Sequence, residues 1–369
     1  MKYLSIILIA FLIAEIHLAA DDKPAYKLFE SDGGSADYGE LLDDALEADI
    51  VFFGEQHNNP ICHWLQFELT KSLYDKKGKE LILGAEMFEA DDQLIINEYL
   101  TDKIAENNFK KEAKLWNNYK TDYKPLLEFA NDSGLTFVAT NIPRRYAALV
   151  AREGLEALED LSRKAKQYMP PLPIEVDLNL PGYKKMEEMF SEGHGIMKKA
   201  NDSNDDNNDE KKDNGKTEKT SMPNGTMPKH HQDGRDTATA GHPHAMNQDT
   251  SEAAHPVMKD QAMPHGHAMM SKMKDKMEFL KMAQAIKDAT MAHFIQKNYK
   301  EGGIFLHYNG TYHSNNHEGI VWFIKRDMPG KKVITIATVL QNEIEDLEEE
   351  NEGLADYILV IPASMTTTY

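Results

Sequence analysis

The fold of this chain is decided by the stretch Ile50-Val51-Phe52-Phe53-Gly54-Glu55-Gln56-His57. Its first four residues are β-branched or aromatic, as expected for a buried parallel strand. Asn59 and Pro60 follow as a predicted N-cap and first helical position, and helical apolar spacing then continues to Gly78. The stretch therefore predicts a strand, a tight turn and a helix, with the acidic residue and the histidine in the turn.

The same alternation of strands and helices recurs along the chain. Further strands are predicted at residues 81–85, 135–139, 303–308, 333–339 and 357–361. Helices are predicted at residues 91–100, 105–116, 123–131, 144–152, 183–199 and 272–299. Strands separated by helices imply an α/β fold, with a mostly parallel central sheet flanked by helices. We expect one such domain, formed by residues 21–199 and 271–369.

Two segments are expected to lie outside this domain. Residues 1–20 have a short basic start, an apolar run and a small-residue cleavage site near Ala20, which are typical of a signal peptide. This pattern predicts a periplasmic or secreted protein without a stable membrane anchor. Residues 200–270 contain almost no large aliphatic residues, so we predict a long disordered insertion rich in His and Met.

Composition narrows the classes of partner. The formal net charge is −20, which repels polyanions, so we expect no nucleic-acid partner. The single cysteine, Cys62, excludes an intramolecular disulfide. We expect its thiol to be a buried small hydrophobic group.

A second Gly-x-x-His pattern, Gly310-Thr311-Tyr312-His313, follows the strand predicted at 303–308. Because the carboxyl ends of neighbouring parallel strands open into one crevice, His57 and His313 are expected to meet there. Glu55 in the first turn and Glu86, directly after the strand at 81–85, would join them. Carboxylates and imidazoles can share a divalent metal, or act as a base with its orienting partner. The alternative is that both acidic residues cap helices and His57 only packs.

These residues give two sets of candidates. The catalytic candidates are Glu55, His57, Glu86 and His313, and the metal-ligand candidates in the crevice are Glu55, His57 and His313. His307 belongs to the strand rather than to the turn, so we expect it to be a core residue.

The insertion contains a second set of residues that could bind a metal ion. Imidazole and thioether groups without thiols suit copper. The candidate metal ligands in the insertion are His242, His244, His265, His267, Met263 and Met269. The alternative is a polar low-complexity linker with no metal role.

Five motifs, taken in order, resemble the ChaN-type haem-binding uptake family, part of a wider group with the Tiki proteases and erythromycin-esterase-like proteins. The resemblance covers about residues 40–199 and 271–365. The motifs are Phe53-Gly54-Glu55-Gln56-His57-Asn58, Gly84-Ala85-Glu86-Met87-Phe88 with Gln93, Tyr123-Lys124-Pro125-Leu126, Ala139-Thr140-Asn141-Ile142-Pro143-Arg144, and Asn309-Gly310-Thr311-Tyr312-His313.

The resemblance implies an exported protein of haem or iron uptake, with haem able to bind as a cofacial pair at a homodimer interface. Relatives in the wider group use the paired Gly-x-x-His positions and an acidic residue for hydrolysis. Arg144 could pair with a haem propionate, and a tyrosinate could ligate ferric haem. We name Arg144, Tyr146 and Tyr312 as candidate cofactor contacts.

Three hypotheses follow. The first is an exported protein that binds haem or metal ions for uptake. The second is a metal-dependent hydrolase that uses the paired Gly-x-x-His site. The third is a copper-binding or copper-buffering protein that acts through the insertion.

Overall fold

The computed structural model describes residues 23–186 and 265–368, with side chains described from residue 275 onward in the second range. The predicted signal peptide lies outside the described residues, and so does the predicted insertion except for the backbone of its last residues. That backbone belongs to the long helix α9 (His265–Asn298), which begins before the helix predicted at 272–299.

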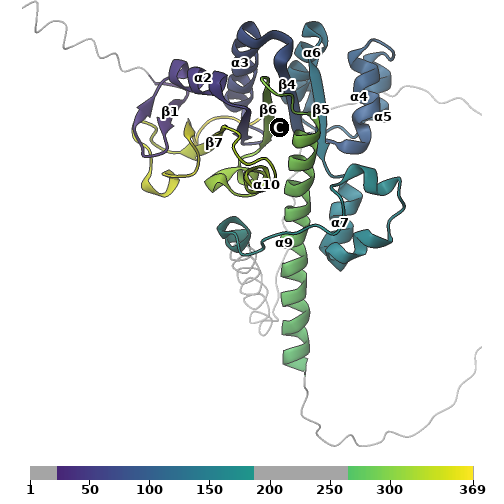
Figure 1. Ribbon diagram of the computed structural model, residues 1–369. Helices are drawn as coiled ribbons and strands as arrows, with labels where there is room; N and C mark the ends of the chain where they lie inside the picture. The colour runs from purple at the N-terminus through teal and green to yellow at the C-terminus, as the bar shows by residue number, and fades with distance from the viewer. Residues whose placement is uncertain (1–22, 187–264, 369) are drawn as a thin grey trace, which may run out of the picture. The chain divides into compact units, whose positions relative to one another are not determined.

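An eight-stranded sheet forms the centre of the described chain (Figure 1), with the strand order β2-β1-β8-β7-β3-β6-β4-β5. The first strand pairs antiparallel with its two neighbours, and the other neighbouring strands pair in parallel. The mostly parallel sheet of an α/β fold is therefore confirmed. The strands are β1 (Lys27–Glu30), β2 (Ser35–Ala36), β3 (Ile50–Glu55), β4 (Leu81–Glu89), β5 (Thr136–Asn141), β6 (Ile304–Gly310), β7 (Val333–Gln341) and β8 (Tyr357–Pro362).

Helices connect these strands and cover the sheet. Besides α9, they are α2 (Tyr38–Glu47), α3 (Pro60–Lys77), α4 (Gln93–Leu100), α5 (Glu106–Glu112), α6 (Lys124–Ser133), α7 (Arg144–Glu153) and α10 (Ile320–Asp327). Residues 181–186 are also helical. The β1–β2 hairpin, α2 and α10 were not predicted from the sequence.

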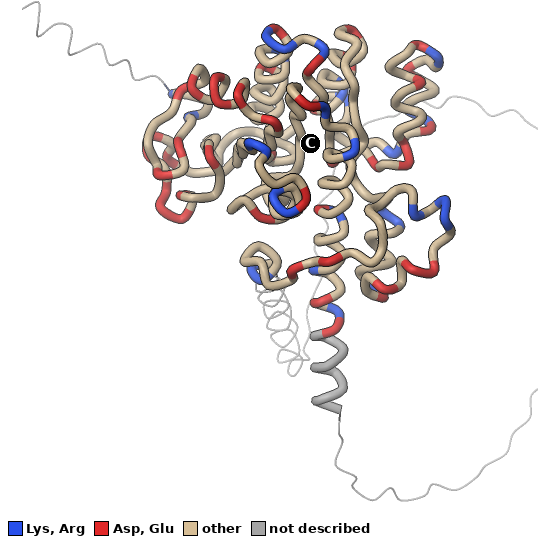
Figure 2. Tube along the Cα trace, in the orientation of Figure 1, with Lys and Arg blue, Asp and Glu red and all other residues tan. Residues whose placement is uncertain are grey.

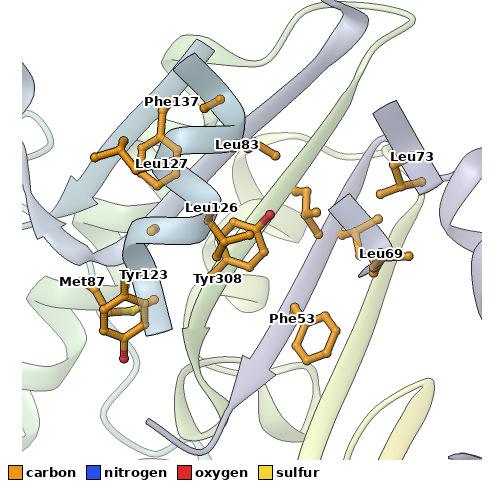
Figure 3. Packing of buried hydrophobic residues seen from close by; sticks show 14 of the residues in the cluster. Phe53, Leu69, Leu73, Leu83, Met87, Tyr123, Leu126, Leu127, Phe137 and Tyr308 are labelled. Carbon is orange, nitrogen blue, oxygen red and sulfur yellow. The ribbon is translucent and has the colours of Figure 1, made fainter. Parts of the chain in front are cut away.

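The two faces of the sheet carry separate apolar cores, because successive side chains of a strand point to opposite faces. Val51 and Phe53 of β3 belong to one core with residues of α3 and α6, and Figure 3 shows Leu69 near Phe53 and Leu126 beside Tyr308. Ile50 and Phe52 pack instead with residues of α9 and α10. The fully buried β3 is thus covered on both sides, as its apolar run predicts.

The helix after β3 begins as the sequence predicts. The Asn59 side chain accepts hydrogen bonds from the backbone amides of Ile61 (3.0 Å) and Cys62 (3.1 Å), with Pro60 at the first turn. The cap fixes where α3 begins, and so it sets the length of the turn that carries His57. Cys62 is buried, and burial raises the pKa of its thiol well above the usual range, so the thiol stays protonated and unreactive.

Charged residues are spread over the described elements. Figure 2 shows acidic residues along most of the trace and basic residues in short groups between them. Lys114, for example, lies 2.7 Å from Asp91 and 2.8 Å from Asp92. Among the helices described, none is long and apolar enough to cross a membrane.

Candidate functional site

A cleft of about 580 Å³ opens at the carboxyl ends of the central strands. Strands β3 and β6 lie side by side there, with Gly54 paired to Asn309 and Glu55 paired to Gly310. The two Gly-x-x-His patterns are therefore neighbours in the sheet, although they are far apart in the sequence. The predicted site residues that line the cleft are Glu55, His57, Glu86, Arg144, Tyr312 and His313.

Strand β4 brings Glu86 to the cleft differently from the prediction. The sequence places Glu86 just after a strand at 81–85, whereas β4 continues to Glu89. The pairing of β4 with β5 shifts between Ala85 and Glu89, as at a β-bulge. Such an irregularity re-aims side chains near the end of a strand.

The glycines of both motifs are required by close approach of other atoms. A Cβ atom at Gly54 would lie 2.8 Å from the Ile336 carbonyl oxygen and 2.9 Å from the Thr311 Cα. A Cβ atom at Gly310 would lie 2.8 Å from Nε2 of His57. Gly54 thus leaves room for the backbone of Ile336 and Thr311, and Gly310 leaves room for the His57 ring.

Replacing Gly310 with alanine should therefore weaken binding of any ligand that contacts His57. The new methyl group would displace the His57 ring, and overpacking of this kind typically costs about 1–3 kcal/mol. A ligand that needs the original position of His57 would have to overcome this cost, which corresponds to at most a roughly 5- to 150-fold loss of affinity, measurable by titration with a ligand of the cleft. The control is Gly39→Ala, at an exposed position of α2, which should bind like the wild type. Equal affinities in both variants would contradict the steric role of Gly310.

Glu55 and His57 form the first carboxylate–imidazole pair of the cleft. His57 Nδ1 lies 2.9 Å from Glu55 Oε1, and Tyr123 donates to the same oxygen at 2.8 Å. Gln66 donates to Oε2 of Glu55 at 2.7 Å. Burial opposes ionisation of Glu55, but the hydrogen bond from His57 and the charges of His63 and His57 hold the pKa of Glu55 below its usual value. The structure therefore places a fixed carboxylate behind Nδ1 of His57.

The backbone and ring of His57 are held as well. Its carbonyl oxygen accepts a hydrogen bond from Asn118 at 2.6 Å, and Nε2 of His63 lies 3.1 Å from the same oxygen. Its ring packs edge-on against Trp116, with 4.9 Å between ring centroids. Burial would lower the pKa of His57, but its hydrogen bond to Glu55 and that carboxylate's charge raise it. His57 is thus an oriented imidazole with a partly exposed ring.

His313 lies between two buried carboxylates. Its Nδ1 is 2.5 Å from Asp288 Oδ1, and its Nε2 is 3.2 Å from Glu86 Oε1. The second oxygen of each carboxylate also accepts a hydrogen bond. Tyr183 donates to Asp288 Oδ2 at 2.6 Å, and the Gly310 amide donates to Glu86 Oε2 at 2.7 Å. Both ring nitrogens of His313 therefore face carboxylate acceptors.

This arrangement favours the charged form of His313. Burial would lower its pKa, but the charges of Glu86 and Asp288 raise the pKa to about 10. Burial opposes ionisation of Glu86, yet the charge and hydrogen bond of His313 hold the pKa of Glu86 far below its usual range. The two histidines of the cleft thus have different surroundings: His57 has one carboxylate partner and His313 has two.

His307 is a core residue, as predicted. It is fully buried, with Nε2 2.8 Å from Thr140 Oγ1 and Nδ1 3.0 Å from Asn309 Oδ1. Burial lowers the pKa of His307 to about 4, so its ring is neutral. It supports the strand β6 beneath the cleft and does not line it.

Cationic and aromatic side chains line the wider part of the cleft. The Arg144 side chain is 74% exposed, and its Nε lies 3.6 Å from Glu89 Oε1. Lys287 of α9 and the partly exposed Tyr312 also line the cleft. Tyr146 is not among the lining residues; its ring stacks under the Arg145 guanidinium, 4.5 Å from the ring centroid.

The described residues contain no group of three or more His, Cys, Asp or Glu side chains placed to hold a metal ion. In the predicted set of Glu55, His57 and His313, the last has both ring nitrogens facing carboxylates. This set is therefore not arranged as a metal centre. The candidate ligands in the insertion lie outside the described side chains; they are His242, His244, His265, His267, Met263 and Met269.

Several residues of the site were not predicted from the sequence, among them Asp288, Gln66, Trp116 and Lys287. A signal for Asp288 was present, because it is an acidic residue on the helix face that carries the buried residues Ala285, Ala292 and Ile295. A carboxylate on an apolar stripe is almost never fully buried without a partner. The identity of that partner, His313, depends on tertiary structure.

The fold and the cleft together define an α/β protein with two carboxylate–imidazole pairs at the carboxyl ends of a mostly parallel sheet. The family model described as haem-binding uptake, Tiki superfamily, ChaN matches residues 41–324. The chain therefore belongs to this ChaN-type haem-binding uptake family.

One solved structure shares the fold at a TM-score above 0.5. A structure of ChaN from Campylobacter jejuni with cofacial haem binding matches with a TM-score of 0.53 and 13% identity, covering 92% of this chain and 97% of that chain. A mutant of the erythromycin esterase EreC in its open conformation matches with a TM-score of 0.37 and 11% identity, covering 86% of this chain and 77% of that chain.

A curated relative matches over a shorter stretch. Protein RETICULATA-RELATED 5, chloroplastic, of Arabidopsis thaliana is 28% identical over 132 residues, or 34% of this chain. The match spans only 18% of the length of that relative.

Proposed function

We propose that this chain is an exported protein of haem or iron uptake, and that haem binds in the cleft at the carboxyl ends of β3, β4 and β6. The observation that carries this proposal is the lining of the cleft, which combines two cations, two aromatic rings and an oriented imidazole within about 580 Å³. A volume of this order is typical of sites for small molecules and cofactors. The family of the chain and its signal-like N-terminal pattern support the role in uptake and export.

The residues of the cleft fit the chemistry of haem. Arg144 and Lys287 would pair with the two propionates, since guanidinium and ammonium groups bind carboxylates. Trp116 would pack against the apolar macrocycle. Tyr312 or His57 would offer a ligand to the haem iron, because ferric haem accepts a tyrosinate or an imidazole. Cofacial haem binding, as in Campylobacter jejuni ChaN, would bring together the clefts of two copies of this chain.

Titration of the purified full chain with hemin tests the proposal. The wild type should show a shifted Soret band that saturates. Arg144→Ser should weaken binding roughly fivefold, because an exposed charge pair contributes about 1 kcal/mol. Tyr312→Phe should move the Soret band if the phenol ligates iron, whereas the matched control Tyr146→Phe should not, because Tyr146 does not line the cleft. Unsaturable hemin uptake by the wild type would contradict haem binding.

A second candidate function is hydrolysis by acid–base chemistry in the same cleft. The observation that favours it is the contrast between the two imidazoles. His57 is oriented by Glu55 and has the character of a general base, whereas His313 is a cation held by Glu86 and Asp288. The copper-buffering role of the insertion stays a prediction, because its side chains lie outside the described residues.

A further inference from the structure

The two histidines of the cleft differ in how many of their ring nitrogens are engaged. A neutral imidazole has one N–H donor and one acceptor nitrogen, whereas an imidazolium has two donors. His313 has a carboxylate oxygen 2.5 Å from Nδ1 and another 3.2 Å from Nε2. Only the imidazolium form can donate to both.

His57 is engaged on one side only. Its Nδ1 faces Glu55, and within the described parts of the chain its Nε2 forms no hydrogen bond. Nε2 lies beside the backbone of Gly310, where a Cβ atom would be only 2.8 Å away, and His57 lines the cleft. The His57 side chain is 38% exposed, compared with 10% for His313.

We propose that Asp288 and Tyr183 are positioning residues that hold His313 as a doubly hydrogen-bonded imidazolium. His57 is then the histidine of the pair whose Nε2 meets a ligand or takes a proton. This inference deepens the proposed function, because it assigns the contact to one imidazole of the cleft. It applies to haem binding and to hydrolysis alike.

The geometry around Asp288 gives this role its physical basis. Asp288 is 2% exposed, and a buried carboxylate is stable only when its charge and lone pairs are satisfied. Tyr183 is 6% exposed and donates to Oδ2 at 2.6 Å, which leaves Oδ1 directed at His313. The Tyr183 hydroxyl thereby fixes the rotamer of Asp288, and Asp288 fixes the ring plane and protonation of His313.

Glu86 completes the arrangement from the other side. Its Oε1 faces His313 and its Oε2 accepts the Gly310 amide at 2.7 Å, so the cation also fixes the backbone at the end of β6. Gly310 is the residue that leaves room for His57 Nε2. Holding His313 as a cation therefore also holds the backbone against which the His57 ring packs.

The test is nitrogen-15 NMR of the histidine rings in the full chain, with His313→Gln used to assign the His313 signals. At neutral pH the wild type should show two ring N–H signals for His313. Asp288→Asn should remove the Nδ1–H signal, because the amide is a poor acceptor partner for a cation. Tyr183→Phe, which removes one hydroxyl only, should shift the Nδ1–H signal. The matched control is Asp356→Asn, which loses the partner of His317 at 3.2 Å and should leave the His313 signals unchanged.

A second measurement addresses His57 and needs no variant. Diethyl pyrocarbonate attacks an unprotonated imidazole nitrogen, so brief treatment at mildly alkaline pH, chosen because the pKa of His57 is raised, followed by mass spectrometry should label His57 and leave His313 unlabelled. Equal labelling of both histidines, or two His313 ring N–H signals that persist unchanged in Asp288→Asn and in Tyr183→Phe, would overturn the proposal. Neither measurement uses hemin or a substrate, so failure of the proposed function would be seen separately in the hemin titration.

Discussion

Replacing His313 with glutamine is expected to lower the free energy of unfolding by about 3–5 kcal/mol, the usual cost of removing one partner of a buried ion pair. Glu86 is 5% exposed and Asp288 is 2% exposed, so both carboxylates would remain buried without a cation between them. Urea denaturation of the wild type and the variant measures the difference. The control is His317→Gln, whose ion pair with Asp356 is more exposed and should cost about 1 kcal/mol or less. Similar losses in both variants would contradict the central role of His313.

His313 and Glu86 also predict how stability depends on pH. The pKa of His313 rises to about 10 in the folded chain, from about 6.5 in an unfolded one. Its contribution is therefore full below about pH 6.5 and is lost as the pH rises toward 10. The pKa of Glu86 is lowered, so its contribution is present above about pH 4.3 and is lost as the pH falls. The melting temperature of the wild type should be highest between these limits.

His313→Gln should change this profile in a defined direction. Without the cation, burial makes the neutral form of Glu86 more favourable in the folded chain. The variant should therefore gain stability relative to the wild type as the pH falls, and it should lose less than the wild type between pH 7 and 10. Melting temperatures across this range, at constant ionic strength, check both slopes. Parallel curves for the two proteins would show that His313 does not titrate as proposed.

The part of the site that follows from strand ends could be predicted from the sequence. A buried parallel strand has a readable apolar run, and the residue after it reaches the carboxyl edge of the sheet. This rule brought His57, His313, Glu55 and Glu86 together correctly. It wrongly placed Glu86 after the end of its strand. The irregular pairing of β4 with β5 cannot be recognised from a short apolar run in the sequence.

The part that depends on contacts between distant elements could not be predicted. Asp288 lies on α9 and meets His313 only because that helix packs against the sheet. Tyr183 reaches Asp288 across a sequence separation of 105 residues. The strand β1 has only four residues and pairs with β8, so its local pattern is too short to identify. In each case the deciding interaction is absent from the local sequence.

Replacing His57 with glutamine should lower kcat by about 10²- to 10⁴-fold for any substrate that the cleft hydrolyses, the usual contribution of a general base. Glutamine keeps an amide that can donate to Glu55, but it cannot take a proton at the position of Nε2. KM should change little, because Arg144 and Lys287 would still hold an anionic part of the substrate. A kcat series over pH in the wild type and the variant measures the effect.

His317→Gln again serves as the matched control, since His317 pairs with Asp356 and does not line the cleft. The result separates the two candidate functions of the cleft. If hydrolysis falls while hemin still saturates the His57→Gln chain, the imidazole acts as a base and Tyr312 is the better candidate for the iron ligand. If hemin binding falls instead and no hydrolysis is measurable in the wild type, His57 is a haem contact. Unchanged kcat in a chain that does hydrolyse a substrate would exclude His57 as the base, and Glu55 would then act only as a buried support for the turn after β3.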